Sequence, residues 1–354
     1  MSESTLASGR DRAGKLGVVV IGRNEGERLV RCLGSISSRA ASVVYVDSGS
    51  SDGSADLARA RGVEVVELDA SLPFTAARGR NAGFETLAAS HPDLAWVQFV
   101  DGDCEFAPGW LEAASEFLAA HPDIGVVFGR RRERHPDASV WNRLIDIEWE
   151  GPPGESDACG GDALMRSDVV RRAGGYDATL IAGEDPEFCL RIRRTGARIM
   201  RLDREMTLHD AALLRFTQWW KRQARAGHAY AETVWRHRDE PDPQRRRRLL
   251  SILLYGGAVP GTSVLLLPPT AGASLLLLLT WALPWRGVYR ETRKRHTPGD
   301  AARYATACVI GKLAEFQGAL TFAWNHAIRR RATALIEYKG PRLGDPGPPG
   351  ARRP

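Results

Sequence analysis

The chain has 354 residues and a formal net charge of +6, with 49 Lys and Arg against 43 Asp and Glu. This length allows one large domain with an appendage, or two modest domains that each bury a core. The five cysteines contain no CxxC pair, which argues against a disulfide framework and a cysteine-based zinc site. The basic balance fits anionic partners, and by itself it does not separate nucleotides, lipid head groups and nucleic acid.

The first part of the chain predicts an α/β domain at residues 16–212. Residues 1–15 are polar and lack the apolar core of a secretory signal, so we expect a flexible tail and a cytoplasmic domain after it. Short β-branched runs then alternate with helical stretches, which is typical of α/β units around a largely parallel sheet. We expect strands at 17–21, 42–46, 63–68, 96–100 and 125–128.

Polar runs follow the first two predicted strands. The first strand leads into residues 22–25, Gly-Arg-Asn-Glu, and the second into residues 47–53, Asp-Ser-Gly-Ser-Ser-Asp-Gly. Open α/β sheets bind ligands at the carboxyl ends of their strands, where an acidic side chain can accept from a ribose hydroxyl or a base N–H. Each run alone also fits a polar turn with capping Ser and Asp, and it is their pairing that favours a nucleotide site.

Two further groups point to phosphate and metal. Arg80 lies in Arg-Gly-Arg-Asn-Ala-Gly at a predicted helix start, where a guanidinium can bind diphosphate in bidentate fashion or remain a solvated charge. Asp101-Gly102-Asp103 directly follow the strand at 96–100. One of these carboxylates can reach a ribose, while the other binds a hard divalent cation that bridges two phosphates.

In this order the Arg-Asn-Glu, Val-Asp-Ser-Gly-Ser, Arg-Asn-x-Gly and Asp-Gly-Asp motifs resemble family 2 glycosyltransferases. The resemblance covers about residues 17–212 and implies the GT-A fold, a Rossmann-like mixed sheet flanked by helices that binds nucleotide sugars. It implies a UDP- or GDP-sugar donor and a divalent cation, Mg²⁺ or Mn²⁺. Under it the donor is held by Glu25, Asp47, Arg80 and Asp101, and the metal by Asp103. Ser48 replaces an aspartate that many relatives carry, which leaves the donor's base and sugar open.

Residues 159–193 resemble the acceptor half of the same family. They contain Cys-Gly-Gly-Asp, Gly-Gly-Tyr-Asp and Gly-Glu-Asp-Pro in that order. The resemblance implies that Asp185 deprotonates the acceptor hydroxyl and that Glu184 and Asp162 bind the acceptor. Direct displacement with inversion also needs one carboxylate near the attacking oxygen, whereas acids at a helix start otherwise complement the helix dipole. His209 stands where many members place a second metal ligand, and a structural histidine is the alternative.

Residues 213–248 predict an amphipathic interfacial region. Aromatic and basic residues mix between Leu214 and Tyr230, which is typical of a helix at the head-group level, and Trp219 and Trp220 are predicted acceptor contacts. The order Gln-Trp-Trp-Lys-Arg departs from the Gln-x-x-Arg-Trp element of processive synthases, so we do not infer processivity. The arginines at 130–134 are expected on a solvated loop beside the cleft.

Residues 249–331 predict a hydrophobic, membrane-associated helical region. The stretches 249–267 and 271–285 are apolar, and two prolines between them leave two short transmembrane helices or a re-entrant hairpin as alternatives. Basic clusters on both flanks place both ends in the cytoplasm. The stretch 304–324 carries Lys312 and Glu315 and predicts an interfacial or bundle-packed helix. Core helices of a soluble domain are the other alternative, and the tail at 332–354 is expected to be flexible.

Together these patterns predict an inverting glycosyltransferase at the cytoplasmic face of the cell membrane. Its acceptor would be a glycan or a polyprenyl-linked molecule, and it would also contact membrane lipids. The reaction would belong to cell-surface polysaccharide or glycolipid synthesis. A nucleotidyltransferase is one alternative, but the first strand lacks the glycine-rich, lysine-bearing loop it would need. A membrane-bound scaffold or nucleic-acid-binding protein is another. The basic residues flank apolar segments, which favours lipid over nucleic acid.

Overall fold

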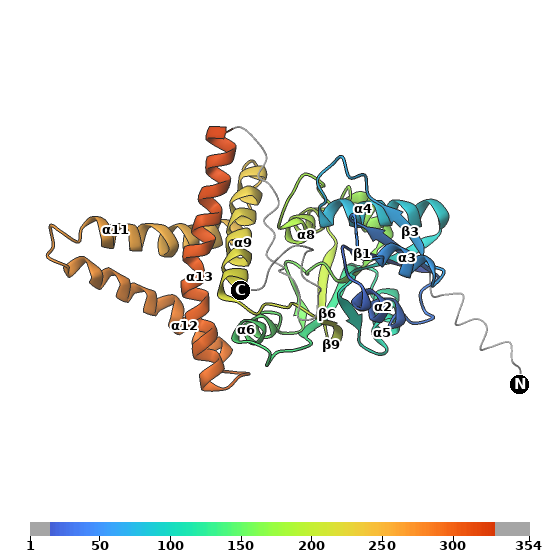
Figure 1. Cartoon of the computed structure of the whole chain (residues 1–354), viewed down its shortest axis with the longest axis horizontal. Helices are drawn as coiled ribbons and strands as arrows, with labels where there is room; N and C mark the ends of the chain where they lie inside the picture. The colour runs from blue at the N-terminus through green and yellow to red at the C-terminus, as the bar shows by residue number, and fades with distance from the viewer. Residues whose placement is uncertain (1–14, 330–354) are drawn as a thin grey trace, which may run out of the picture. The chain divides into compact units, whose positions relative to one another are not determined.

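The computed structural model describes residues 15–329, which form two compact units (Figure 1). The first unit contains residues up to Arg134 together with Trp149–Asp210, and the second contains His135–Glu148 and the chain from Ala211 onward. Helix α6, Val140–Glu148, therefore belongs to the second unit although it lies inside the range 16–212. The two predicted tails fall outside the described residues, apart from Lys15.

A mixed sheet forms the centre of the first unit. Its strand order is β3-β2-β1-β4-β8-β6-β9-β5, with β7 on the outer side of β9. Strands β1 to β4 are parallel, while β8 runs antiparallel to both of its neighbours. The strands are β1 Lys15–Gly22, β2 Ser42–Asp47, β3 Glu64–Glu67, β4 Leu94–Asp101, β5 Cys104–Phe106, β6 Ile124–Glu133, β7 Gly154–Glu155, β8 Ala163–Arg166 and β9 Arg198–His209. The predicted α/β class and the five predicted strands are confirmed.

Among the described residues of the first unit, six helices accompany this sheet. They are α2 Glu27–Gly34, α3 Ser54–Arg59, α4 Ala76–Ser90, α5 Trp110–Ala120, α7 Ser167–Arg172 and α8 Glu184–Arg194. Strand β1 is fully buried from Leu16 to Val20, because helices cover both faces of a parallel sheet. Such a strand carries continuous apolar residues without alternation, and this is why the β-branched runs located the strands correctly.

Strand β6 is longer than its apolar run. The expectation that residues 130–134 form a solvated loop is wrong, because pairing with β9 continues the strand to Glu133. Strand side chains alternate between the two faces of a sheet. The continuation therefore aims Arg131 inward, where only a small part of its side chain is exposed.

The second unit is helical. Besides α6 it contains α9 Phe216–Arg236, α10 Pro243–Ile252, η1 Leu253–Ala258, α11 Val259–Leu265, η2 Ala273–Trp281, α12 Ala282–Thr292, α13 Pro298–Trp324 and η3 Asn325–Arg329. Helices α9 and α13 pack backbone to backbone: a Cβ on Gly227 would lie 1.8 Å from the Glu315 carbonyl oxygen. Glycine is needed at such contacts. Helix α13 is thus packed in a bundle, one of the two arrangements expected for residues 304–324.

Candidate active site

Three strand ends meet at one edge of the sheet. Gly22 pairs with Asp47 across β1 and β2, and Ile21 pairs with Asp101 across β1 and β4. The parallel register therefore places Asp47 and Asp101 on either side of the end of β1, at the edge where open α/β sheets bind ligands. The sequence predicted this convergence.

Asp47 and Glu25 are both buried and bonded within this edge. The Asp47 carboxylate accepts hydrogen bonds from the Tyr45 hydroxyl at 2.9 Å and from the Ser50 backbone N–H at 2.7 Å. Glu25 forms an ion pair with Arg28. In this structure, therefore, both predicted donor-binding acids shape the loops at the strand ends.

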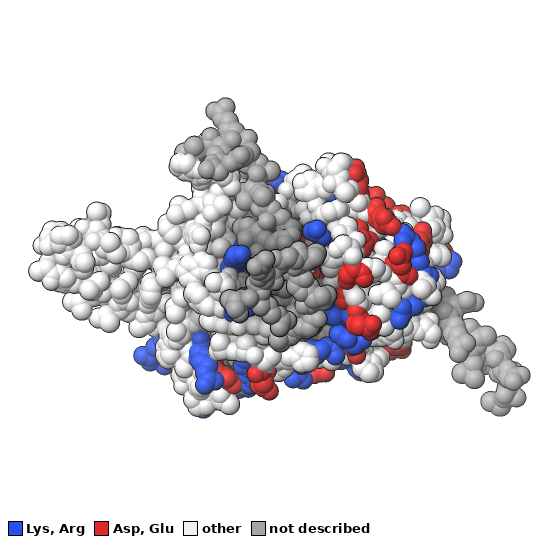
Figure 2. Space-filling view, in the orientation of Figure 1, with Lys and Arg blue, Asp and Glu red and all other residues white. Residues whose placement is uncertain are grey.

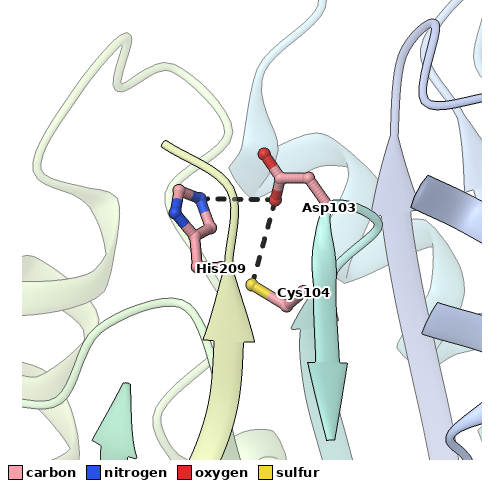
Figure 3. Close-up of side chains that lie close together, drawn as sticks. All are labelled: Asp103, Cys104 and His209. Carbon is pink, nitrogen blue, oxygen red and sulfur yellow. Dashed lines mark hydrogen bonds and ion pairs between the residues drawn. The ribbon is translucent and has the colours of Figure 1, made fainter. Parts of the chain in front are cut away.

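Asp103 and His209 lie side by side (Figure 3). The antiparallel ladder of β5 and β9 pairs Cys104 with His209, which brings His209 Nε2 to 3.4 Å from Asp103 Oδ1. Both side chains are buried, and the Trp149 ring packs edge-on against the imidazole. Two residues that are far apart in the sequence thus meet with a carboxylate oxygen and an imidazole nitrogen facing each other.

This donor set fits a small divalent cation. Asp103, Cys104 and His209 form a possible metal-binding group among the described residues. Carboxylate and imidazole ligands suit Mn²⁺, and carboxylates with phosphate oxygens suit Mg²⁺. Burial raises the pKa of the Cys104 thiol well above its ordinary value. Hard cations also prefer oxygen and nitrogen ligands to sulfur. His209 Nδ1 is buried with no hydrogen-bond partner among residues 15–329.

Arg28 adds a built-in positive charge to these acids. Its Nη1 lies 3.9 Å from Asp103 Oδ2 and 3.9 Å from Asp210 Oδ2, while Nη2 pairs with Glu25. The guanidinium is buried, so these charges compensate one another in a poorly solvated place. The sequence analysis did not predict a role for Arg28. It lies on α2, where the sequence indicates only an apolar helix face that packs on the sheet.

Arg80 gathers a second group of acids. Its Nη2 lies 3.0 Å from Asp101 Oδ1, and its Nη1 lies 3.3 Å from Glu184 Oε1 and 2.9 Å from Asp185 Oδ1. Arg80 is only 2% exposed. The guanidinium joins the end of β4 to the first turn of α8. A contact between Arg80 and the donor diphosphate stays a prediction.

Asp185 is the most perturbed acid of this group. Burial raises the pKa of Asp185 to about 7, and the neighbouring carboxylates of Glu184 and Asp101 act in the same direction. Arg80 opposes the rise because it favours the ionised carboxylate. A part of the Asp185 side chain remains exposed, whereas Arg80 does not. Asp185 is therefore placed to exchange a proton with a ligand.

Asp162 has a role that differs from the predicted one. Its side chain has no exposed surface through which an acceptor could touch it. The carboxylate accepts from the Asp101 backbone N–H at 3.1 Å and from the Thr207 hydroxyl at 2.8 Å, and it pairs with Arg131 at 2.9 Å. Arg131 Nη2 also lies 3.9 Å from Asp101 Oδ2. Asp162 thus holds the Asp101 backbone in place from inside the sheet.

Comparison with known proteins identifies this arrangement. The family model of glycosyl transferase family 2 matches residues 17–172. The chain carries a family 2 glycosyltransferase domain. The match covers Glu25, Asp47, Arg80 and both acids of the Asp-Gly-Asp motif, and it favours the glycosyltransferase interpretation over the nucleotidyltransferase and scaffold alternatives.

Two curated relatives support the glycosyltransferase domain. Pre-mycofactocin glycosyltransferase from Mycobacterium tuberculosis is 29% identical over 245 residues, which are 64% of this chain and 49% of the relative. Glycosyltransferase AglE from Haloferax volcanii is 26% identical over 194 residues, 51% of this chain and 61% of the relative. The chain thus spans about half the length of the first relative and three fifths of the second.

Solved structures confirm the GT-A fold. Mannosyltransferase PcManGT from Pyrobaculum calidifontis, in complex with GDP-Man and Mn²⁺, superposes with a TM-score of 0.53 at 18% identity, covering 88% of each chain. GalNAc-T7 with UDP, GalNAc and Mn²⁺ gives 0.51 at 14% identity, covering 70% of this chain and 51% of that one. At these identities the likeness concerns the fold alone.

The predicted acceptor contacts Trp219 and Trp220 lie outside the glycosyltransferase unit. Both belong to α9 in the helical unit. Trp219 is buried and stacks on Trp141, with ring centroids 5.0 Å apart. The Trp220 indole N–H donates to Gln317 Oε1 at 2.7 Å. In the structure these rings pack the bundle, and an acceptor role for them stays a prediction.

Proposed function

We propose that this family 2 glycosyltransferase moves one sugar from a nucleoside diphosphate sugar to a hydroxyl of a glycan or polyprenyl-linked acceptor, with inversion. One observation supports the proposal above the others. Arg80 holds Asp101, from the donor-side motif, and Asp185, from the acceptor-side motif, on a single guanidinium. The proposed donor-binding acid and the proposed base therefore lie close to each other.

In this mechanism Asp185 is the general base. Its carboxylate takes the proton of the acceptor hydroxyl while that oxygen attacks the anomeric carbon. The bond from this carbon to the diphosphate oxygen breaks on the opposite face, and the electron pair leaves with the nucleoside diphosphate. A base works best when its pKa lies near the operating pH, and the raised pKa of about 7 meets that condition.

Asp103 and His209 are the proposed holders of Mg²⁺ or Mn²⁺. Such an ion, when bound, neutralises charge on the diphosphate leaving group. The buried carboxylate–imidazole pair supports this assignment. So do the Mn²⁺ ions in the two solved structures of similar fold. Asp101 would contact the donor ribose, since its carboxylate is 27% exposed at the edge of the sheet.

The proposed place of action is the cytoplasmic face of the cell membrane, in polysaccharide or glycolipid synthesis. The helical unit supports this location because its exposed apolar side chains are concentrated between Leu250 and Leu283. Basic residues stand on both sides of this segment, where they can meet anionic lipid head groups.

A donor panel tests the proposal. Detergent-purified protein is mixed with UDP- and GDP-sugars in Mn²⁺, Mg²⁺ or chelator, and binding and donor hydrolysis are measured for the wild type, Asp103→Ala and Asp185→Asn. We expect one donor to bind with metal, to lose binding in Asp103→Ala, and to bind without turnover in Asp185→Asn. Asp168→Asn, at an exposed acid on α7, is the matched control and should behave as the wild type. Donor binding that ignores both metal and Asp103 would refute the proposal.

A further inference from the structure

Exposed apolar side chains are gathered on an arm of the helical unit. It consists of residues 258–283, in which α11 and η2 run antiparallel and are joined by a turn at 266–272 (Figure 1). The side chains of Leu265, Leu276 and Leu283 are 76%, 66% and 68% exposed. Residues 249–285 contain no Asp, Glu, Lys, Arg or His, and Figure 2 shows the arm without charged side chains on the visible face. Water is a poor environment for such a surface.

The turn at the tip pairs its own backbone N–H groups. Every backbone N–H from Leu266 to Leu275 donates to an acceptor within the arm, and the two residues without an N–H are Pro268 and Pro269. The hydroxyls of Ser263, Thr270 and Ser274 donate to carbonyls of the same arm. A surface loop in water has no need of this closure, whereas a turn inside hydrocarbon must have it.

The residues are graded from tip to base. Leucines flank the turn at the tip, Tyr255, Trp281 and Trp285 follow toward the base, and arginines then lie on both flanks at 245–248 and 286–295. The Trp281 indole N–H donates to the Tyr255 backbone carbonyl at 3.2 Å, so the Trp281 ring lies beside the backbone at residue 255. Aromatic belts lie at the membrane interface, and basic residues lie beyond them among the phosphates.

The length of the arm limits how deep it can go. Below Ala258 the chain is packed on α13, because a Cβ on Gly256 would lie 2.0 Å from the Lys312 carbonyl oxygen. Helix α13 itself carries the ion pair Lys312–Glu315, which is buried within the protein. Ten residues from Ala258 to Leu267 rise about 15 Å at about 1.5 Å each. The hydrocarbon core is about 30 Å thick.

One described helix, Pro243–Leu265, is long and apolar enough to cross a membrane by length and composition, with 17% of its apolar window buried. Part of that length lies at the base, however: Ile252 is fully buried and Gly256 packs on α13. The projecting part is too short for a full crossing.

We propose that residues 258–283 form a re-entrant wedge that enters one leaflet of a lipid bilayer and turns back near its middle without crossing it. This inference rests on the proposed membrane location and is independent of the sugar-transfer chemistry. It fixes both flanks of the arm on the same side of the membrane. The wedge would anchor the chain where a lipid-linked acceptor presents its head group.

Depth measurements test the wedge. In a Cys308→Ser background, whose four other cysteines are buried, Thr270→Cys at the tip and Arg290→Cys at the base each receive a fluorescent label. The full chain is bound to vesicles of phosphatidylcholine and phosphatidylglycerol that carry nitroxides at known depths. We expect quenching of the tip label to be strongest with the nitroxide at the acyl-chain end, and quenching of the base label with the nitroxide in the head group.

Two outcomes of this experiment would overturn the wedge. If a membrane-impermeant thiol reagent trapped inside the vesicles reacts with Thr270→Cys, the arm crosses the bilayer. If the same reagent reacts from outside while the protein is bound, the tip lies in water. A tip label shielded only by a second copy of the chain, without vesicles, would also contradict the proposal.

A pair of charge variants separates the wedge from the enzyme. Leu265→Glu and Leu276→Glu place a carboxylate in the arm, and each should weaken vesicle binding by about a hundredfold, as expected for a charge moved into hydrocarbon. Leu72→Glu, at a 53% exposed leucine of the first unit, is the matched control and should bind vesicles normally. Donor binding in detergent should be unchanged in all three. If the wild type binds no donor, the proposed function is refuted and the wedge is unaffected. If both arm variants bind vesicles normally, the wedge is refuted.

Discussion

Arg80 Nη1 lies 2.9 Å from Asp185 Oδ1, although the two residues are more than a hundred positions apart in the chain. The same guanidinium contacts Asp101, so one buried cation orders the acids of both halves of the site. Arg80 is buried, and in the proposed mechanism it positions Asp185 and tunes the pKa of this base. Its removal should therefore alter a titration as well as a rate.

Arg80→Met should lower the stability and shift the pH profile together. Removing one partner of a buried ion pair leaves carboxylates uncompensated, which typically costs about 3–5 kcal/mol of unfolding free energy. Because Arg80 lowers the pKa of Asp185, its loss should move the midpoint of the pH–kcat profile upward by about one unit or more. Urea unfolding and initial rates would measure both. Arg172→Met, at an exposed arginine of α7, should change neither; an unshifted midpoint in a folded Arg80→Met protein would contradict the tuning role.

Turnover should rise with pH through about 7. Asp185 acts as a base only when ionised, and its pKa is raised to about 7, so activity should be lost as the pH falls below that value. Asp185→Asn should reduce kcat by roughly 10²–10⁴-fold with little change in donor affinity. The measurement is kcat against pH with a buffer series at constant ionic strength. A profile that stays flat from pH 5 to 9 would exclude Asp185 as the titrating base.

Mn²⁺ binding should depend on both Asp103 and His209. Asp103→Asn removes the charge and His209→Ala removes the imidazole, so each should raise the Kd for Mn²⁺ at least about tenfold. Calorimetry or the electron paramagnetic resonance of free Mn²⁺ would measure this without any sugar acceptor. Cys104→Ala is the matched control, because hard cations prefer oxygen and nitrogen over a thiol. If Cys104→Ala weakens binding as much as His209→Ala does, the ligand set is wrong.

Asp162→Asn should lower both the stability of the protein and its affinity for the donor. The substitution leaves Arg131 buried beside a neutral amide, and a loss of about 3–5 kcal/mol in unfolding free energy is expected. Donor affinity should fall as well, because Asp162 also holds the backbone N–H of Asp101. Asp168→Asn, which breaks an exposed pair with Arg172, should leave unfolding unchanged. An Asp162→Asn protein of normal stability that loses only acceptor affinity would restore the role first predicted for this residue.

The sequence by itself determined the strands and the acids at their ends. Strand β1 is apolar without interruption because both its faces are buried, and Asp47 and Asp101 follow apolar runs because polar side chains are tolerated where strands leave the core. These signals are local, since a strand and its exit are encoded within about ten neighbouring residues. The motifs in residues 17–193 are also short local runs, and their order indicated the glycosyltransferase family.

Only the tertiary structure decided which charged groups pair. The sequence predicts Arg80 as a diphosphate contact or a solvated charge, and Asp162 as an acceptor contact. Packing buries both side chains and gives each of them partners that no local pattern predicts. Likewise the β5–β9 register, rather than any spacing, brings His209 to Asp103. A buried charge requires a counter-charge wherever the fold can supply one, and that choice is made by contacts between segments distant in the chain.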